Sequence, residues 1–158
     1  MKIKRFIVNP LQQNTYVLSD ESTREAVMID CGVLFESEEQ EVARYIKDEG
    51  LTLKHLLLTH AHFDHACGVP FVFNTFGVSA EFSREDEWLY YTMSEQIKRF
   101  LRADVTFNMP RPAGYFSAGD TVTFGNTSLT CIATPGHTPG GLSFYNKEDG
   151  VLFGGDSL

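Results

Sequence analysis

The chain has 158 residues, 42% hydrophobic and 22% charged, a balance typical of one globular domain, which we expect to span residues 1–158. Its net charge of −8 argues against electrostatic binding of nucleic acid or of an anionic membrane, although a bound metal ion could still attract a small anionic substrate. The three cysteines form no CxxC pair, and no apolar run resembles a signal peptide or approaches the ~20 residues of a membrane span. We therefore expect a cytoplasmic protein with reduced thiols and no membrane segment.

The first third of the sequence predicts three short strands and a helix. The strands are the apolar and β-branched runs Ile3–Val8, Thr15–Leu18 and Ala26–Ile29, which turn residues separate as in a meander. Residues 37–50 predict a helix that Ser37 caps, with Gln40 completing a capping box and Gly50 ending it. The apolar run that follows predicts a buried strand ending near Thr59.

The middle of the sequence is predicted to be mainly helical. Residues 67–76 and 84–102 predict a short and a long helix, with a short strand at 79–82 between them and a turn-rich connector at 108–114. The long helix carries Trp88, Tyr90 and Tyr91, which could line a substrate cleft. We favour ordinary core and surface positions for these aromatic residues.

From Asp120 the pattern returns to strands. Two alternating runs meet at Gly125-Asn126, a hairpin signal, and a second pair follows at 142–145 and 151–153. Strands, helix, strand, helices and strands in this order predict an α/β sandwich in which helices cover the sheets.

The segment THAHFDH, residues 59–65, crowds ligand-type side chains behind a predicted buried strand. It holds three of the five histidines, His60, His62 and His65, together with Asp64. Residues i and i+2 of an extended backbone point to the same side, so His60 and His62 can bind one ion, while Asp64 and His65 can serve a neighbouring one. Imidazole and carboxylate ligands suit zinc best, with iron or manganese as alternatives. The competing interpretation, a solvated loop with incidental histidines, is much weaker for four such residues at this spacing.

Two later positions also place a polar side chain at a strand end. His137 lies in the glycine- and proline-rich loop TPGHTPGG, and Asp156 follows an apolar run in FGGDSL. Each is weak evidence alone, but with the cluster they supply two more ligands. His55 opens the buried strand outside these loops, so we interpret it as structural or exposed.

Four motifs together resemble those of the metallo-β-lactamase superfamily. VMIDCG at 27–32, THAHFDH at 59–65, TPGHTPGG at 134–141 and FGGDSL at 153–158 are similar to its first four motifs and stand in the expected order. The last two are most similar to the glyoxalase II-like branch, the hydroxyacylglutathione hydrolase relatives. The resemblance implies an αββα metallo-β-lactamase-type sandwich whose C-terminal part is missing after the fourth motif.

The resemblance also implies a role for each motif residue. The ligands of a first metal ion would be His60, His62 and His137. Those of a second would be Asp64 and His65, with Asp156 bridging the two ions. Asp30 would steady the ligand loops by hydrogen bonds. Asp64 would also be catalytic, because its carboxylate can orient or accept a proton.

The sequence departs from the superfamily at its end. The fifth motif is a histidine that completes the second metal site, and no histidine follows Asp156. We therefore expect a longer protein or a partner chain to supply the missing part, and poor binding of a second ion by these 158 residues. The strand edge at 151–153 would also favour association between copies of the chain.

The implied activity is that of a zinc-dependent hydrolase acting on a small thioester, such as a hydroxyacylglutathione-type substrate, with a hydroxide held between two ions. The alternatives are a persulfide dioxygenase of the same superfamily with one iron, and a metal-binding but inactive domain. The missing export signal disfavours a lactamase, and the net charge disfavours nucleic-acid processing. The letters GDSL at 155–158 match the name of a lipase family, but in those enzymes further catalytic residues follow the serine.

Overall fold

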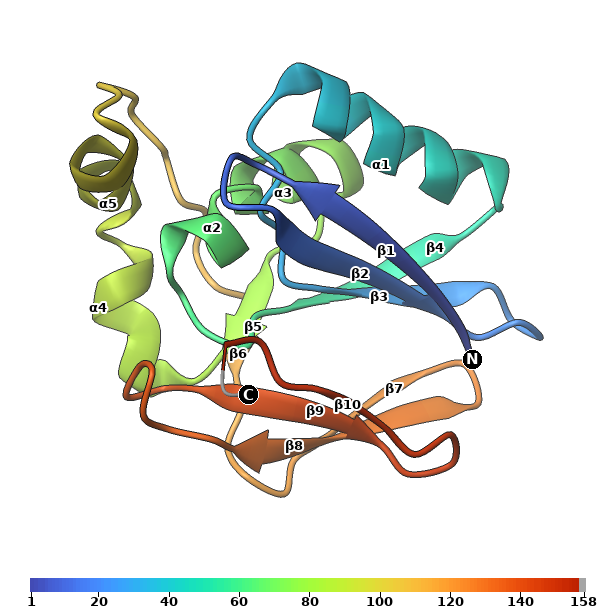
Figure 1. Ribbon diagram of the computed structural model, residues 1–158. Coiled ribbons are helices and arrows are strands. Elements are labelled where there is room, and N and C mark those ends of the chain that lie inside the picture. The colour runs from blue at the N-terminus through green and yellow to red at the C-terminus, as the bar shows by residue number, and fades with distance from the viewer. Residues whose placement is uncertain (157–158) are drawn as a thin grey trace.

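Two β-sheets lie face to face, and helices cover the outer face of the first sheet (Figure 1). The computed structural model describes residues 1–156, so Ser157 and Leu158, the end of the GDSL letters, lie outside the described residues. One apolar core lies between the first sheet and its helices, and a second lies between the two sheets. In residues 1–156 no helix is long and apolar enough to cross a membrane.

The first sheet has six strands in sequence order. They are β1 (Lys2–Val8), β2 (Gln13–Ser19), β3 (Glu25–Ile29), β4 (Thr52–Leu57), β5 (Ala80–Phe82) and β6 (Gly114–Tyr115). The predicted meander is confirmed, because β1, β2 and β3 pair antiparallel, with Lys2 opposite Ser19 and Val17 opposite Met28. From β3 onward the pairing is parallel. The short strand β6 was not predicted and replaces the end of the expected connector.

The first long helix begins at a different residue from the one predicted. Helix α1 spans Glu36–Asp48, and Phe35 rather than Ser37 precedes its first turn. The carboxylate of Glu38 accepts hydrogen bonds from the backbone N–H groups of Leu34 and Phe35, at 2.9 and 3.1 Å, so it has the capping-box role predicted for Gln40. The helix ends before Gly50, which has a φ of +63°, as predicted.

The predicted long helix at 84–102 is divided into three pieces. They are the 3₁₀ turn η1 (Arg84–Asp86), α4 (Glu87–Tyr90) and α5 (Met93–Leu101). Two side chains interrupt the helical pattern at the carbonyl of Leu89, since Thr92 Oγ1 and Gln96 Nε2 donate to it at 2.8 and 2.9 Å. The predicted helix at 67–76 begins later, as α3 (Val69–Phe76), and a separate short helix, α2 (Phe63–Ala66), lies inside the histidine motif.

The second sheet is antiparallel and has the order β10-β9-β8-β7. Its strands are β7 (Thr121–Phe124), β8 (Thr127–Ala133), β9 (Leu142–Asn146) and β10 (Val151–Phe153). Both predicted strand pairs are confirmed, including the β7–β8 turn at Gly125-Asn126. Within residues 1–156 the helices cover only the first sheet, so the second helical layer of the αββα arrangement is not among the described residues (Figure 1).

The topology brings four strand ends to one edge of the sandwich. Strands β3 and β4 are parallel neighbours, and β8 and β10 run in the same direction because each is antiparallel to β9. The chain leaves these strands toward Asp30, the His60–His65 segment, His137 and Asp156 respectively. A backbone hydrogen bond from Leu142 N to the carbonyl of Thr59, 2.8 Å long, joins the two sheets at this edge. All the predicted ligand segments therefore meet in one place.

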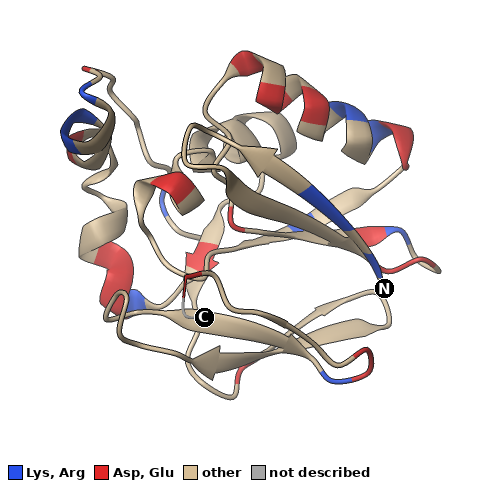
Figure 2. Cartoon of the chain, in the orientation of Figure 1, with Lys and Arg blue, Asp and Glu red and all other residues tan. Residues whose placement is uncertain are grey.

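Charged residues are distributed over several parts of the surface. Lys and Arg lie on β1, α1 and α5, and Asp and Glu lie beside them (Figure 2). This mixed arrangement agrees with a net charge of −8 and differs from the basic stripe that binds nucleic acid.

Candidate metal centre

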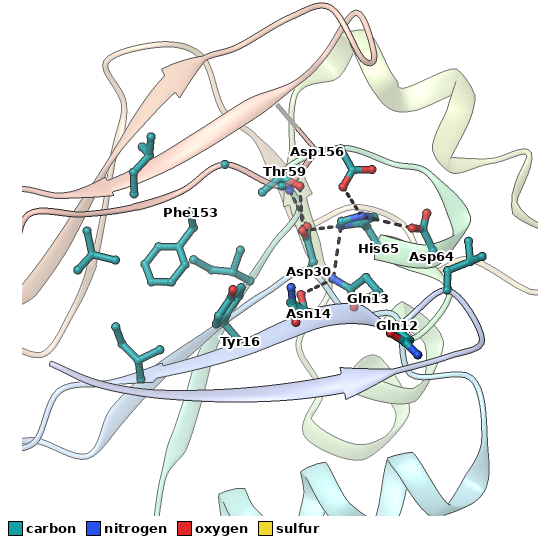
Figure 3. A pocket seen from close by; sticks show the side chains of 17 residues that line it. Gln12, Gln13, Asn14, Tyr16, Asp30, Thr59, Asp64, His65, Phe153 and Asp156 are labelled. Atoms are coloured by element: carbon teal, nitrogen blue, oxygen red, sulfur yellow. Dashed lines mark hydrogen bonds and ion pairs between the residues drawn. The ribbon is translucent and has the colours of Figure 1, made fainter. Parts of the chain in front are cut away.

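His65 lies at the centre of the site, with carboxylates on both sides of its ring (Figure 3). Its Nδ1 is 2.8 Å from Oδ2 of Asp30, while its Nε2 is 3.4 Å from Oδ2 of Asp64 and 3.2 Å from Oδ1 of Asp156. Asp30 is 2% exposed, and Thr59 donates to it from both its backbone N–H and its hydroxyl, each at 2.8 Å. Asp30 therefore orients the His65 ring and leaves Nε2 facing the site.

His60 presents a free lone pair to the same space. Its Nδ1 is 3.0 Å from Oγ1 of Thr59, a hydroxyl whose proton is already donated to Asp30. The proton of a neutral His60 ring is therefore placed on Nδ1, and Nε2 is left as an acceptor. This Nε2 is buried and has no hydrogen-bond partner in the described part of the chain. A metal ion is the kind of partner that such an orphaned nitrogen fits.

His62 and His137 complete a group of three imidazoles. Nδ1 of His62 and Nε2 of His137 face each other at 3.0 Å, although their residues are 75 positions apart in the sequence. With His60 they form a set whose ligand atoms all lie within 4.8 Å of one another. These are the three histidines predicted to share the first ion, and the structure brings them together.

A second group overlaps the first. His60, His65 and Asp156 also have ligand atoms within 4.8 Å of one another. Asp156 Oδ2 lies 3.1 Å from Nε2 of His137 and 3.6 Å from Nε2 of His60, so its carboxylate stands between the two groups, as a bridging ligand must. The geometric groups differ from the predicted ones. His60 belongs to both groups, Asp156 is a member of the second group only, and Asp64 stands beside the second group, 3.4 Å from Nε2 of His65.

The protonation states follow from burial and from neighbouring charges. Burial lowers the pKa of His60 to about 4, which keeps its ring neutral at pH 7, and burial beside His137 also lowers the pKa of His62. Burial also acts to lower the pKa of His65, but the Asp30 and Asp156 carboxylates outweigh it and raise the pKa to about 10. The hydrogen bond from His65 lowers the pKa of Asp156 to about 2, so this carboxylate is ionised.

The donor set suits a divalent metal ion. Neutral imidazole nitrogens and ionised carboxylates are the ligands of zinc, iron and manganese in proteins. His60, His62 and His137 would hold one ion. Asp156 and Asp64 are available to a second ion, and His65 could join them once that ion displaces the proton from its Nε2. The open space beside them is a cavity of about 390 Å³, lined by Asp64, His65 and Asp156 at one end and by Tyr16 and Phe153 at the other (Figure 3).

Sequence reasoning missed the residues that hold the ligand loops from behind. Gln96 accepts from Phe63 N at 2.9 Å and donates to the carbonyl of Ala61. Asn9 donates to the carbonyl oxygens of Gly32 and Asp64, at 2.9 and 3.0 Å. Asp86, which is fully buried, bonds both the Ala61 backbone and the loop after His137. These residues lie in segments without a motif, and the sequence contains no local signal of their role.

Two further sequence predictions concern residues outside the ligand groups. His55 pairs with Glu81 at 2.6 Å, in agreement with a structural position. Among the aromatic residues at 88–91, Tyr90 is fully buried, while Trp88 and Tyr91 are 60% and 52% exposed. Core and surface positions are thus confirmed for them.

Comparison with known proteins agrees with the fold. The chain matches the metallo-beta-lactamase superfamily model over residues 8–158. Hydroxyacylglutathione hydrolase GloC of Haemophilus influenzae is 31% identical over 159 residues, which cover 100% of this chain and 72% of that protein. Persulfide dioxygenase ETHE1 of Mus musculus is 32% identical over 144 residues, which cover 91% of this chain and 47% of that protein.

Solved structures give the same result. BLEG-1 B3 metallo-beta-lactamase superposes with a TM-score of 0.84 and 32% identity, covering 99% of this chain and 73% of that one. TTHA1623 in a di-iron-bound form superposes with a TM-score of 0.78 and 26% identity, covering 94% of this chain and 69% of that one. Since the family model, the relatives and the superposed structures all span nearly the whole sequence, the chain belongs to the metallo-beta-lactamase superfamily.

Proposed function

We propose that the protein is a metal-dependent hydrolase of a small thioester, with the metal centre formed by the predicted ligands. The observation that carries this proposal is the convergence of His60, His62 and His137, with the buried Nε2 of His60 lacking a hydrogen-bond partner among residues 1–156. A divalent ion held there would supply Lewis acidity, which makes water a better nucleophile at neutral pH and stabilises negative charge on a carbonyl oxygen.

The chain's own residues would position the reactants and move the proton. The Asp64 carboxylate, 3.4 Å from Nε2 of His65, is placed to accept a proton from water at its Oδ2. Its main chain is fixed by the Asn9 amide, which bonds the Asp64 carbonyl. Asp30 holds the His65 ring in one orientation, so that Nε2 of His65 stays beside the carboxylates of Asp64 and Asp156.

A thioester suits this site for a chemical reason. A thiolate is a good leaving group, so a strong general acid is not needed. Among residues 1–156 the cavity lining has no carboxyl group besides those of Asp30, Asp64 and Asp156. The cavity wall combines apolar side chains, Ile3, Leu11 and Leu152, with the amides of Gln12 and Asn14. Such a wall fits a small substrate with both hydrocarbon and peptide-like parts. The similarity to hydroxyacylglutathione hydrolase GloC over the whole chain further supports a thioester.

A persulfide dioxygenase is the second candidate. It is favoured by the 32% identity to persulfide dioxygenase ETHE1 over 91% of this chain. That activity would need one iron, which the three-histidine group alone could hold. The presence of the second, overlapping group favours the hydrolase.

The test is metal analysis combined with a substrate panel. The protein is purified without added metal, its zinc, iron and manganese are counted, and it is assayed with a hydroxyacylglutathione thioester, glutathione persulfide and a chromogenic cephalosporin. We expect zinc and thioester hydrolysis that a chelator removes and zinc restores. Because His60 belongs to both groups, we expect one tightly held ion per chain and a second ion that binds more weakly.

The other results would separate the alternatives. Iron with oxygen consumption on the persulfide would favour the dioxygenase, and cleavage of the cephalosporin a lactamase. Bound metal without turnover of any substrate would favour an inactive metal-binding domain.

A further inference from the structure

Asp86 lies behind the metal centre and bonds two of its loops at once. Its Oδ2 accepts hydrogen bonds from the backbone N–H of Ala61 at 3.1 Å and from the Thr138 hydroxyl at 2.8 Å. Its Oδ1 accepts from the backbone N–H of Gly140 at 2.8 Å. Ala61 stands between the ligands His60 and His62, and Thr138 directly follows the ligand His137. One carboxylate therefore joins the neighbours of all three histidines of the first group.

The contact is close and buried. Asp86 is fully buried, and Thr138 is 2% exposed. A Cβ added to Gly140 would lie 2.7 Å from Asp86 Oδ1 and 2.9 Å from Asp86 N, so the loop passes against the carboxylate with no room for a side chain. The short helix α4, which follows Asp86, is anchored in the core by Leu89 and Tyr90. Asp86 is thus a fixed point to which both loops are attached.

We propose that Asp86 is a positioning residue that sets the distance between the His60–His62 segment and the His137 loop, and so the affinity of the three-histidine group for its ion. This proposal rests on the metal centre described under the proposed function. Residues that orient metal ligands without touching the ion typically change affinity or activity by about 10- to 100-fold when replaced. Asp86 acts on the backbone of the ligand segments instead of on an imidazole.

Asp20 provides a matched control. It is also a buried aspartate, 6% exposed, and its carboxylate accepts from the hydroxyls of Ser22, Thr23 and Thr127. It joins the β2–β3 turn to β8 and contacts no ligand segment. A purely structural role for Asp86 predicts that replacing either aspartate lowers stability and leaves metal affinity unchanged.

The experiment compares Asp86→Asn with Asp20→Asn. In Asp86→Asn the amide N–H₂ must face either Gly140 N–H or Ala61 N–H, so one loop loses its acceptor and meets a donor. Affinity for Zn²⁺ is measured by competition with a chromophoric chelator, and ligand geometry by the visible spectrum of the Co²⁺-loaded protein. The melting temperature of the metal-free protein is measured for each variant.

A second pair keeps the test informative if Asp86→Asn folds poorly. Thr138→Val removes the hydroxyl that bonds Asp86, and Thr138→Ser keeps it. We expect Asp86→Asn to weaken Zn²⁺ binding by about 10- to 100-fold with an altered Co²⁺ spectrum. Thr138→Val should also weaken Zn²⁺ binding, whereas Thr138→Ser should bind Zn²⁺ as the wild type does. Asp20→Asn should lower the melting temperature and leave the Zn²⁺ affinity and the Co²⁺ spectrum unchanged.

The failures are distinguishable. If the wild-type protein takes up no Zn²⁺ or Co²⁺, the proposed metal centre is wrong, and the role of Asp86 falls with it. If the wild type binds the ion and Asp86→Asn and Thr138→Val bind it equally well, the centre stands and the positioning role is overturned.

Discussion

The two halves of the candidate centre are held in different ways. The half that extends from the first sheet is mostly buried. His60 and His65 are only 3% and 5% exposed, each ring is bonded at Nδ1 by Thr59 or Asp30, and His62 and Asp64 are half-buried. The half that extends from the second sheet is open, since the side chains of His137 and Asp156 are 42% and 41% exposed. The fold therefore arranges the first half by itself, whereas the second half depends more on its loops and on the ion.

Asp64 belongs to the first half and lies beside Nε2 of His65, and its replacement should have the largest effect. We expect Asp64→Ala to lower kcat/KM for the thioester by about 10²- to 10⁴-fold, the usual contribution of a group that transfers a proton. The fold should stay largely intact, because the Asp64 side chain is partly exposed on the short helix α2 and its carbonyl, which Asn9 bonds, is retained. Circular dichroism and steady-state kinetics check both parts. Near-normal turnover would remove Asp64 from the mechanism.

Removing one histidine from each half tests the comparison directly. His65→Ala leaves the buried Asp30 carboxylate without its partner ring, so we expect the metal-free protein to lose about 3–5 kcal/mol of stability. His137→Ala removes an exposed side chain and should change that stability by less than about 0.5 kcal/mol. Urea unfolding of the chelator-treated proteins measures both values. Equal losses would show that the two halves are held alike.

The contact between the halves can be disturbed without removing a ligand. Gly155 has a φ of +58°, and a Cβ there would lie 2.4 Å from Thr59 Oγ1, the hydroxyl that holds Asp30 and His60. We expect Gly155→Ala to cost about 1–2 kcal/mol from its left-handed backbone alone, and to weaken metal binding because Asp156 moves away from the first half. Thermal unfolding and Zn²⁺ competition are the measurements. A variant that is unchanged in both would contradict the close contact.

Asp20, remote from both halves, should show the smallest effect and a defined pH dependence. Hydrogen bonds from Thr127, Thr23 and Ser22 lower the pKa of Asp20 below its ordinary value of 3.8. Because the folded pKa is the lower one, the stabilisation is present above pH ~4 and is lost as the pH falls toward the folded pKa. The melting temperature of Asp20→Asn should therefore lie below that of the wild type at pH 7, with a difference that shrinks below pH 4. A difference independent of pH would contradict this.

Local patterns predicted most of the strands, and the motifs named the side chains that the structure brings together at the candidate centre. The β7–β8 hairpin follows from two alternating runs around Gly125-Asn126, and both signals lie within a few residues. The prediction of one long helix at 84–102 was wrong because Thr92 and Gln96 donate hydrogen bonds to the Leu89 carbonyl. A helical periodicity in the sequence does not reveal such bonds. Strand β6 was missed because it has only two residues, which form a strand by pairing with the distant β5 and not through a local sequence pattern.

The site shows the same limit. The cluster at 60–65 can be recognised in the sequence because its four ligand-type residues lie within six positions, namely His60, His62, Asp64 and His65. Asp86 is 25 residues from Ala61 and 52 from Thr138, in an acidic segment that resembles any solvated helix start. Its burial depends on the packing of distant elements, and sequence periodicity carries no information about that packing.

Because four strand ends meet at one edge, the residues that stabilise the fold differ from the residues that form the candidate metal centre. The apolar residues that stabilise the protein lie inside the strands and helices, while the ligands lie in the segments that follow β3, β4, β8 and β10. Substitutions around the cavity rim, such as at Leu11 or Leu152, can therefore accumulate without loosening either core. A sandwich of this kind can exchange one substrate for another over evolution, or in the laboratory, while keeping its metal ligands in place.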